Sequence, residues 1–308
     1  MGTTETEKTH VSARGFDLRP PHEALDILAT AQMSAAWSVR AALGDIARAS
    51  EIMADALSAG GSLIYAGAGS SALMALADAL ELPGTYGIAR TCIKVLVAGG
   101  VASLADLVGS PEDDELEAAR DVARAGIGAG DVLVALSASG STPYALGVAK
   151  AARARGTHII GIANNPGSPL LDASDVAICL PTPAEVIAGS TRMGAATAQK
   201  IALNMLSTLM ASRLGHVHDG YMVNLLADNL KLKARACRIV AAVAEVGDDE
   251  AATALDGAGG SVKTAILLAA GAGDATTANT LLERTRGRLR PALSVLRASA
   301  TAAQRNAS

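Results

Sequence analysis

Short runs of apolar residues alternate with helical patterns through much of this sequence, and this alternation constrains the fold more than any other feature. A strand that is apolar along its whole length needs cover on both faces, and alternating strands and helices provide that cover in a parallel sheet. The sequence therefore predicts an α/β fold, a doubly wound parallel sheet flanked by helices. The expected strands are residues 63–66, 93–98, 131–136, 158–163 and 176–180.

The pattern changes at both ends of the sheet region. Residues 1–20 are polar and show no period, so we expect an irregular N-terminus. Beyond the sheet region the pattern is wholly helical, and glycines divide it into short helices. We expect a sheet domain over residues 21–245 and a small helical C-terminal unit over residues 246–308. The helices expected in the sheet domain are residues 21–59, 72–82 (ended by Pro83-Gly84), 112–125, 142–155 and 195–214.

Charge and composition exclude several classes of partner. The chain carries a net charge of −4 and no basic block, which disfavours nucleic acid as a partner. It contains no apolar stretch long enough for a membrane helix and no apolar signal region, so we expect a cytoplasmic protein without a membrane partner. Its three cysteines lack zinc-binding spacing, and we expect them to be reduced thiols.

Two loops rich in glycine and hydroxyl groups follow expected strands, at residues 67–71 and 137–142. Free N–H groups at a helix start, together with nearby hydroxyls, bind phosphate well. Either loop alone could be an ordinary turn, with Thr142 as a helix N-cap. The pair favours an anion site, because ligands of parallel sheets bind outside the carboxyl ends of the strands. The expected phosphate-binding residues are Gly69, Ser70, Ser71, Ser137, Ser139, Ser141 and Thr142.

A dinucleotide is the alternative ligand for the first loop. Residues 67–72, Gly-Ala-Gly-Ser-Ser-Ala, fit the relaxed G-x-G-x-x-A pattern. The following strand ends in Gly99-Gly100 and offers no acidic residue for a ribose hydroxyl, and the P-loop lysine pattern is absent. We therefore expect a phosphate ester and not NAD.

Two further loops carry a family resemblance. They are Asp78-Ala-Leu-Glu-Leu-Pro-Gly-Thr-Tyr-Gly87 and Ala184-Glu-Val-Ile-Ala-Gly-Ser-Thr-Arg-Met193, the second of which continues into Thr197-Ala-Gln-Lys200. With these loops the sequence closely resembles the N-acetylmuramic acid 6-phosphate etherases, a family with the sugar isomerase (SIS) fold. The resemblance implies that the sheet domain is an SIS sugar-phosphate domain that binds an amino sugar phosphate. It also implies a homodimer whose active sites borrow residues across the interface.

The resemblance implies two catalytic carboxylates. The family's acid, which protonates the leaving oxygen, falls on Glu81, and its base, which removes the proton at carbon 2 of an open-chain sugar, falls on Glu112. The aldehyde of that sugar acidifies the carbon-2 proton, so elimination needs a base and an acid but no cofactor. From the residues alone, Glu112 could instead be surface charge at a helix start. By resemblance, the sugar site is also lined by Glu185, Ser190, Thr191 and Arg192.

Several of these residues have simpler explanations. Ser190 could be only an N-cap, and Arg192 could merely pair with Glu185. His216 and His218 lie in a glycine-bounded loop, where they could be a second acid/base pair, a metal pair or residues contributed to a partner subunit's site. A third metal ligand is missing, so we expect no metal.

The sequence departs from the family pattern at cationic positions. Ser141 stands where the etherases carry Arg, Gly194 stands in place of a Lys, and Ala72-Leu-Met-Ala75 replaces Gly-Arg-Leu-Gly. The lactyl carboxylate of a muramic substrate would want such a cation. The sequence therefore favours a dehydratase of N-acetylglucosamine 6-phosphate, with an etherase that releases D-lactate as the alternative. A non-catalytic sugar-phosphate sensor and an aldose–ketose isomerase are further alternatives.

Overall fold

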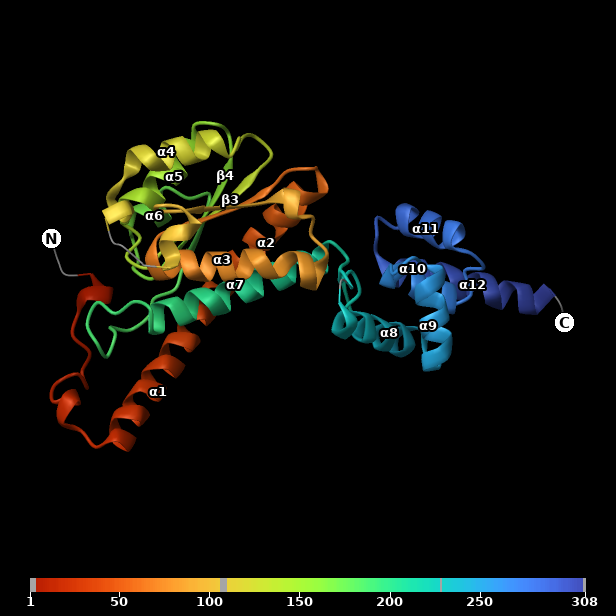
Figure 1. Cartoon of the computed structure of the whole chain (residues 1–308), viewed down its shortest axis with the longest axis horizontal. Helices are drawn as coiled ribbons and strands as arrows, with labels where there is room; N and C mark the ends of the chain where they lie inside the picture. The colour runs from red at the N-terminus through yellow and green to blue at the C-terminus, as the bar shows by residue number, and fades with distance from the viewer. Residues whose placement is uncertain (1–3, 106–109, 228, 307–308) are drawn as a thin grey trace. The chain divides into compact units, whose positions relative to one another are not determined.

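A sheet of parallel strands forms the centre of the first of two compact units in the computed structural model, which describes residues 4–105, 110–227 and 229–306 (Figure 1). The strands are β1 (Leu63–Gly67), β2 (Ile93–Val97), β3 (Val132–Ser137), β4 (His158–Ala163) and β5 (Val176–Cys179). They pair in the order β2-β1-β3-β4-β5, and every pair is parallel. β1 and β3 are buried along their whole length. The predicted parallel sheet is confirmed.

The chain changes direction across the sheet between β1 and β3. Gly67, at the end of β1, pairs with Val97 of β2 on one side and with Leu136 of β3 on the other. The loops that follow β1 and β3 therefore start from adjacent strand ends. In open α/β sheets such a switch point is where ligands bind.

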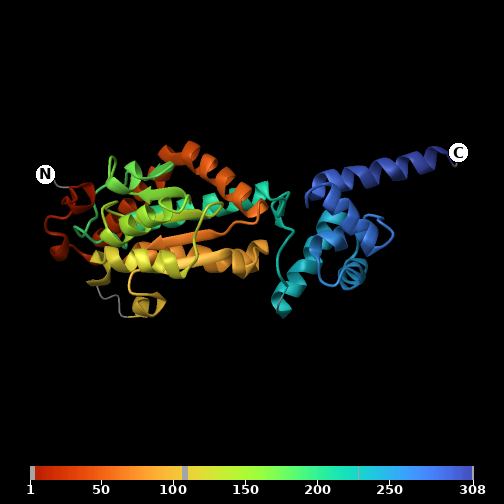
Figure 2. The same cartoon turned by 90° about the horizontal axis from the view of Figure 1, so that it is seen from above.

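Helices cover both faces of this sheet (Figures 1 and 2). Those of the first unit are α1 (Pro21–Ser38), α2 (Leu43–Ser58), α3 (Gly69–Tyr86), α4 (Glu115–Arg124), α5 (Pro143–Arg153), α6 (Pro169–Asp172) and α7 (Gly194–Arg213). The first unit contains α3 as far as Leu80 and α7 as far as Leu209, and the remaining turns of both helices belong to the second unit. α4 and α5 pack on the face that contains Ile64 and Ile159. On the opposite face the Tyr65 hydroxyl donates to the Asp78 carboxylate of α3 at 2.9 Å. The Ser207 hydroxyl of α7 donates to the same carboxylate at 3.1 Å, so α3 and α7 lie side by side.

Helix α3 runs further than the sequence pattern predicted. We expected Pro83-Gly84 to end this helix, and it continues to Tyr86. A proline inside a helix removes one backbone donor, and here the surrounding turns keep the helical path. The helix ends at Gly87, whose φ of +64° suits a glycine, and the Gly87 N–H donates to the Pro83 carbonyl at 3.0 Å.

The second unit is helical and has an apolar core of its own, to which Val223, Ile239 and Ile266 belong. It comprises Glu81–Ala89 and Met210–Ser308. Its elements are the strands β6 (Val217–His218) and β7 (Tyr221–Met222) and the helices α8 (Leu230–Ala244), α9 (Asp248–Gly257), α10 (Val262–Ala269), α11 (Ala275–Arg284) and α12 (Leu289–Asn306). None of the helices in the described residues combines the length and the apolarity that a membrane crossing requires.

Candidate active site

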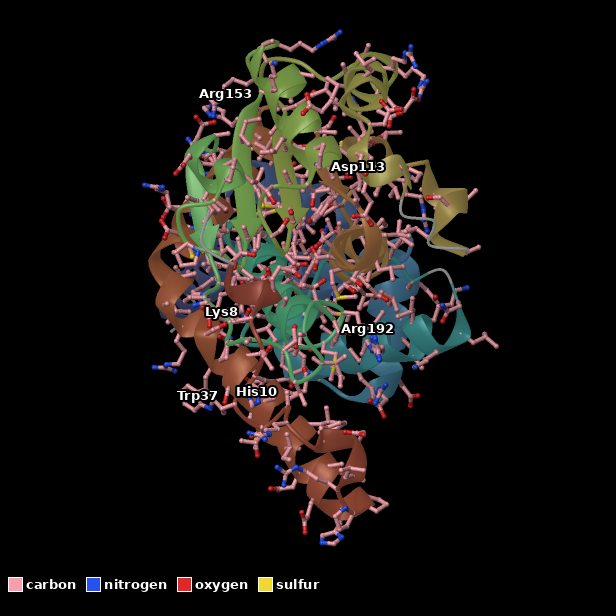
Figure 3. All side chains as sticks on the ribbon, turned by 90° about the vertical axis from the view of Figure 1, so that its left-hand side faces the viewer. Lys8, His10, Trp37, Asp113, Arg153 and Arg192 are labelled. Carbon is pink, nitrogen blue, oxygen red and sulfur yellow. The ribbon has the colours of Figure 1, made fainter. Side chains whose placement is uncertain are left out.

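A polar cavity of about 330 Å³ lies at the carboxyl ends of β1 and β3, within the first unit. Figure 3 looks onto this side of the molecule and labels Lys8, Asp113 and Arg192, the chain neighbours of three lining residues. Segments that are far apart in the sequence therefore meet around one hollow. The lining residues are Thr6, Glu7, Ala68, Gly69, Ser70, Ser71, Glu112, Ala138, Ser139, Thr142, Gly189 and Thr191.

The loop after β1 brings the start of α3 to the cavity. Helix α3 begins at Gly69, so the first N–H groups of the helix have no partner within it and are available to an anion. Ser70 and Ser71 add hydroxyl groups beside them. Gly69 has a φ of +51°, and a Cβ atom at this position would lie 2.7 Å from Oε1 of Glu112. Glycine is therefore required here both by the backbone conformation and by the carboxylate that occupies the space.

The loop after β3 presents a network of hydroxyl groups. The Ser137 Oγ lies 2.8 Å from the Thr142 Oγ1, and the Ser141 hydroxyl donates to the Ser139 Oγ at 3.0 Å. Thr142 makes no side-chain cap for α5, so the hydroxyl is held by this network and not by the helix. Ser139 and Thr142 line the cavity. Ser137 and Ser141 lie outside the lining, and their hydrogen bonds hold the hydroxyl groups of Thr142 and Ser139 in place.

Glu112 comes from a short 3₁₀ turn, Ser110–Asp113, and its carboxylate reaches the cavity. We predicted a helix from residue 112, but α4 begins at Glu115 because the Asp114 side chain accepts the Glu117 N–H at 2.8 Å and caps it. Burial raises the pKa of the Glu112 carboxyl, and the neighbouring Asp113 carboxylate raises it further. A carboxylate whose pKa is raised in this way is a stronger base than an exposed one.

The segment before α7 forms another wall of the cavity, through Gly189 and Thr191. Ser190 is partly buried and Arg192 is exposed, and neither belongs to the lining. Glu185 is buried, and its carboxylate accepts the N–H groups of Gly194 at 3.0 Å and Ala195 at 2.8 Å. Glu185 therefore caps the start of α7, where the helix dipole stabilises its charge.

The N-terminal segment closes the remaining side of the cavity, and sequence reasoning missed it. Residues 5–7 form a 3₁₀ turn, and Thr6 is only 3% exposed. The Asn165 side chain accepts the Thr6 N–H at 3.3 Å and donates to the Thr6 hydroxyl at 3.0 Å and to the Ser139 carbonyl at 3.2 Å. We expected residues 1–20 to be irregular because they are polar and show no period. The hydrogen bond between Thr6 and Asn165 spans 159 residues and leaves no local pattern in the sequence.

Glu81 lies toward the other end of α3. Leu80 precedes it in the chain and is eleven residues beyond Gly69, roughly 17 Å along a helix. Asp78, about one turn earlier on α3, is 3% exposed. The Asp78 carboxylate accepts the hydrogen bonds from Tyr65 and Ser207 described above, and the Lys200 Nζ lies 3.8 Å from its Oδ1. Burial, and then the Asp78 carboxylate, raises the pKa of the Tyr65 hydroxyl well above its usual value.

His216 and His218 belong to the second unit. His218 is in the β6–β7 hairpin, where its Nε2 lies 3.5 Å from the Asp219 Oδ2 and burial lowers its pKa. Burial lowers the pKa of His216 to about 4, and the Lys263 ammonium contributes to that shift. Within the described ranges no three His, Cys, Asp or Glu side chains come together as a metal site would require.

The shifted pKa of His216 predicts an acid-dependent loss of stability. His216 takes up a proton near pH 6.5 in the unfolded chain but only near pH 4 in the folded chain. Protonation between these values therefore favours the unfolded chain, so the stability that neutral His216 provides is fully present above pH 6.5 and is lost as the pH falls to 4. The loss should be at most about 3 kcal/mol in the free energy of unfolding. The free energy of unfolding, measured with urea across this pH range, should depend less steeply on pH for His216→Gln than for the unchanged protein. His158→Gln, at an exposed position, should have the same pH dependence as the unchanged protein. Identical slopes for His216→Gln and the unchanged protein would contradict the prediction.

Comparisons with known proteins place this chain among its relatives. The SIS domain family matches residues 31–164. The N-acetylmuramic acid 6-phosphate etherase of Deinococcus radiodurans is 42% identical over 263 residues, which cover 85% of this chain and 86% of the relative. The chain belongs to the N-acetylmuramic acid 6-phosphate etherase family. The etherase of Streptomyces avermitilis is 39% identical over 293 residues, 95% of this chain and 94% of that one.

Solved structures agree on the fold of this etherase-family chain. A phosphoheptose isomerase from Francisella tularensis superposes with a TM-score of 0.51 at 19% identity, over 63% of this chain and 100% of that one. At that identity the likeness concerns the fold alone. The family resemblance and the SIS-type fold that the sequence indicated are both confirmed.

Proposed function

We propose that this chain is a carbon–oxygen lyase that opens the lactyl ether of N-acetylmuramic acid 6-phosphate and releases D-lactate. The observation that carries the proposal is the half-buried carboxylate of Glu112 in one cavity with two phosphate-type loops. Full-length relatives named for this reaction support it. They favour ether cleavage over the loss of water that the sequence departures first suggested.

The proposed reaction divides the work between the loops and the carboxylates. The N–H groups at the start of α3 and the hydroxyls of Ser139 and Thr142 hold the phosphate. Glu112 takes the carbon-2 proton of the open-chain sugar, and the electron pair of that C–H bond forms the double bond between carbons 2 and 3. The carbon-3 to oxygen bond breaks, and the leaving oxygen receives a proton from Glu81. The aldehyde of the substrate acidifies the carbon-2 proton, so the step uses no cofactor.

We infer that a second copy of the chain supplies Glu81. Within the described residues the lining of the cavity includes Glu112 but not Glu81, and an acid and a base that act on adjacent carbons must both reach the same cavity. An apolar groove on the first unit offers a surface for that copy. Helix α1 borders this groove, and among its described residues Ala35 is the one that is buried, so large apolar side chains of α1 such as Trp37, which is 66% exposed, face solvent in a single copy. Large apolar side chains in a groove mark interaction surfaces. Those lining it include Met33, Trp37, Leu43, Ile201 and Met205.

Trp37→Glu should therefore convert a dimer to a monomer and lower turnover by about tenfold or more, because it replaces a large apolar side chain of the groove with a charged one that is costly to bury. Analytical ultracentrifugation over a range of concentrations measures the first effect, and lactate release measures the second. Leu116→Glu is the matched control, since Leu116 is 73% exposed on α4, outside the groove. A variant that stays dimeric and active would remove this surface from the interface.

A dehydratase remains the second candidate, because the cavity lacks a cation for the lactyl carboxylate. Its lining, within the described residues, includes neither Lys nor Arg. At Gly194, where the family has Lys, a Cβ atom would lie 3.0 Å from the Cβ of Ala35 and 3.1 Å from the Glu185 Oε2, so a side chain there would require these neighbours to shift.

Product analysis by mass spectrometry separates the candidates. Purified protein is given N-acetylmuramic acid 6-phosphate and N-acetylglucosamine 6-phosphate separately. Lactate from the first substrate supports the etherase, and a product of the second that is lighter by one water supports the dehydratase. An isomer of either sugar would indicate an aldose–ketose isomerase, and binding without any product would indicate a sensor. Either of these last two results would overturn the proposal.

A further inference from the structure

The N-terminal turn is built into the wall of the cavity. Thr6 is buried, and its two hydrogen bonds to Asn165 tie the turn to the loop that carries Ser139. The next residue, Glu7, is exposed to solvent and lines the cavity. Anchoring of Thr6 therefore holds the Glu7 side chain at the rim of the site.

Glu7 lies against the wall formed by the segment before α7. Gly189 has a φ of +74°, and a Cβ atom at this position would lie 3.4 Å from the Glu7 Oε2. The cavity thus contains a second carboxylate besides Glu112, contributed by the same copy of the chain. The roles assigned above to Glu81 and Glu112 leave this carboxylate without a function.

The chemistry of a carboxylate restricts what Glu7 can bind. An ionised carboxylate accepts hydrogen bonds and donates none, so it cannot hold a phosphate and repels one nearby. Its partner must therefore be a hydrogen-bond donor on the sugar itself. An amino sugar phosphate offers hydroxyl groups and the N–H of its acetamido group.

We propose that Glu7 is a substrate-binding residue that accepts a hydrogen bond from a hydroxyl or the acetamido N–H of the sugar, beside the Gly189 wall. The proposal rests on the proposed function only for the class of ligand, an amino sugar phosphate. It divides recognition in the cavity between two parts. The loops after β1 and β3 recognise the phosphate, and the N-terminal turn recognises the sugar.

Calorimetric titration of the full chain tests this division without relying on turnover. The ligands are N-acetylglucosamine 6-phosphate and inorganic phosphate, and the variants are Glu7→Ala and Glu7→Gln. Glu7→Ala should weaken binding of the sugar phosphate by roughly tenfold to a hundredfold, the range of a hydrogen bond to a charged group. Inorganic phosphate should bind equally well or more tightly, because a nearby negative charge has been removed. Glu7→Gln, which keeps one acceptor oxygen, should lie between Glu7→Ala and the unchanged protein.

Glu5→Gln is the matched control. Glu5 is on the same turn, but its carboxylate pairs with the Lys8 Nζ at 2.6 Å and is not part of the cavity lining. It should bind both ligands as the unchanged protein does. Equal weakening of both ligands by Glu7→Ala, or unchanged affinity for the sugar phosphate, would overturn the proposal.

A variant of the anchor supplies an independent readout. Thr6→Val removes the hydroxyl that accepts from the Asn165 side chain, so the turn should loosen and the sugar phosphate should bind more weakly, with phosphate unaffected.

Kinetics give a second test if turnover is found. Glu7→Gln should raise KM, keep kcat within about threefold and leave the pH profile unchanged, because loss of a residue that only binds weakens the ground state and the transition state equally. A lost limb in the pH profile would instead make Glu7 an acid or base and overturn its binding role. If turnover is absent, the proposed function fails while the titrations still decide the role of Glu7.

Discussion

Glu112→Gln is expected to lower kcat by about a thousandfold while the affinity for N-acetylglucosamine 6-phosphate stays within about threefold, because the amide keeps the shape of the side chain and cannot take a proton. Half-burial and Asp113 raise the pKa of the Glu112 carboxyl, so the substitution removes a stronger base than an exposed carboxylate. Lactate release measures kcat, and calorimetric titration measures the affinity. A variant that keeps its turnover would show that another group removes the proton.

Asp113→Asn is the matched control for this prediction. The Asp113 carboxylate raises the pKa of Glu112, so its removal should lower that pKa. The acidic limb of the pH–rate profile should then move to lower pH while the maximal rate changes little. A large loss of rate without a moved limb would indicate a different role for Asp113.

The second large effect is expected at Gly69. Gly69→Ala places a Cβ atom 2.7 Å from the Glu112 Oε1 and forces a side chain into a backbone with φ of +51°. The carboxylate must move, so turnover should fall about a hundredfold or more, and phosphate binding should weaken because the start of α3 shifts with it. The loss of unfolding free energy should be about 1–3 kcal/mol. Activity and inorganic phosphate affinity are the two measurements.

Gly60→Ala separates the two causes. Gly60 also has a positive φ, +87°, but a Cβ atom there would meet no atom within 4 Å. It should show the backbone penalty in stability and keep both turnover and phosphate affinity. If the two variants lose stability alike and Gly69→Ala keeps its activity, the contact between Gly69 and Glu112 has no functional weight.

Much of the sheet and of the phosphate loops could be predicted from local pattern. Continuous apolar runs specify buried parallel strands, and the topology of such a sheet brings the ends of β1 and β3 together, so the loops with Ser70 and Ser139 could be expected in one place. Family membership, recognised on the loop sequences, is likewise confirmed.

Other parts of the site depend on contacts that local pattern does not encode. Glu7 reaches the cavity only because Thr6 binds Asn165, and the acidic run at residue 112 indicated a helix start although Asp114 caps the helix later. Glu185 was expected to line the sugar site, yet it is buried under the first turn of α7. The continuation of α3 past Pro83 to Tyr86 also escaped prediction, because a proline signal argues against it.

The carboxylate of Asp78 has one further consequence, for how the protein can respond to a ligand. Its oxygens are engaged by Tyr65 and Ser207 on two other elements, so sliding α3 past α7 would strand a buried charge without donors. α3 begins at Gly69 in the cavity lining, α7 begins at Gly194 shortly after the lining residue Thr191, and the Asp78 carboxylate couples the two helices. Any tightening around a bound sugar must therefore come from the connecting turns, and the spacing between the two helix starts should be the same with and without ligand.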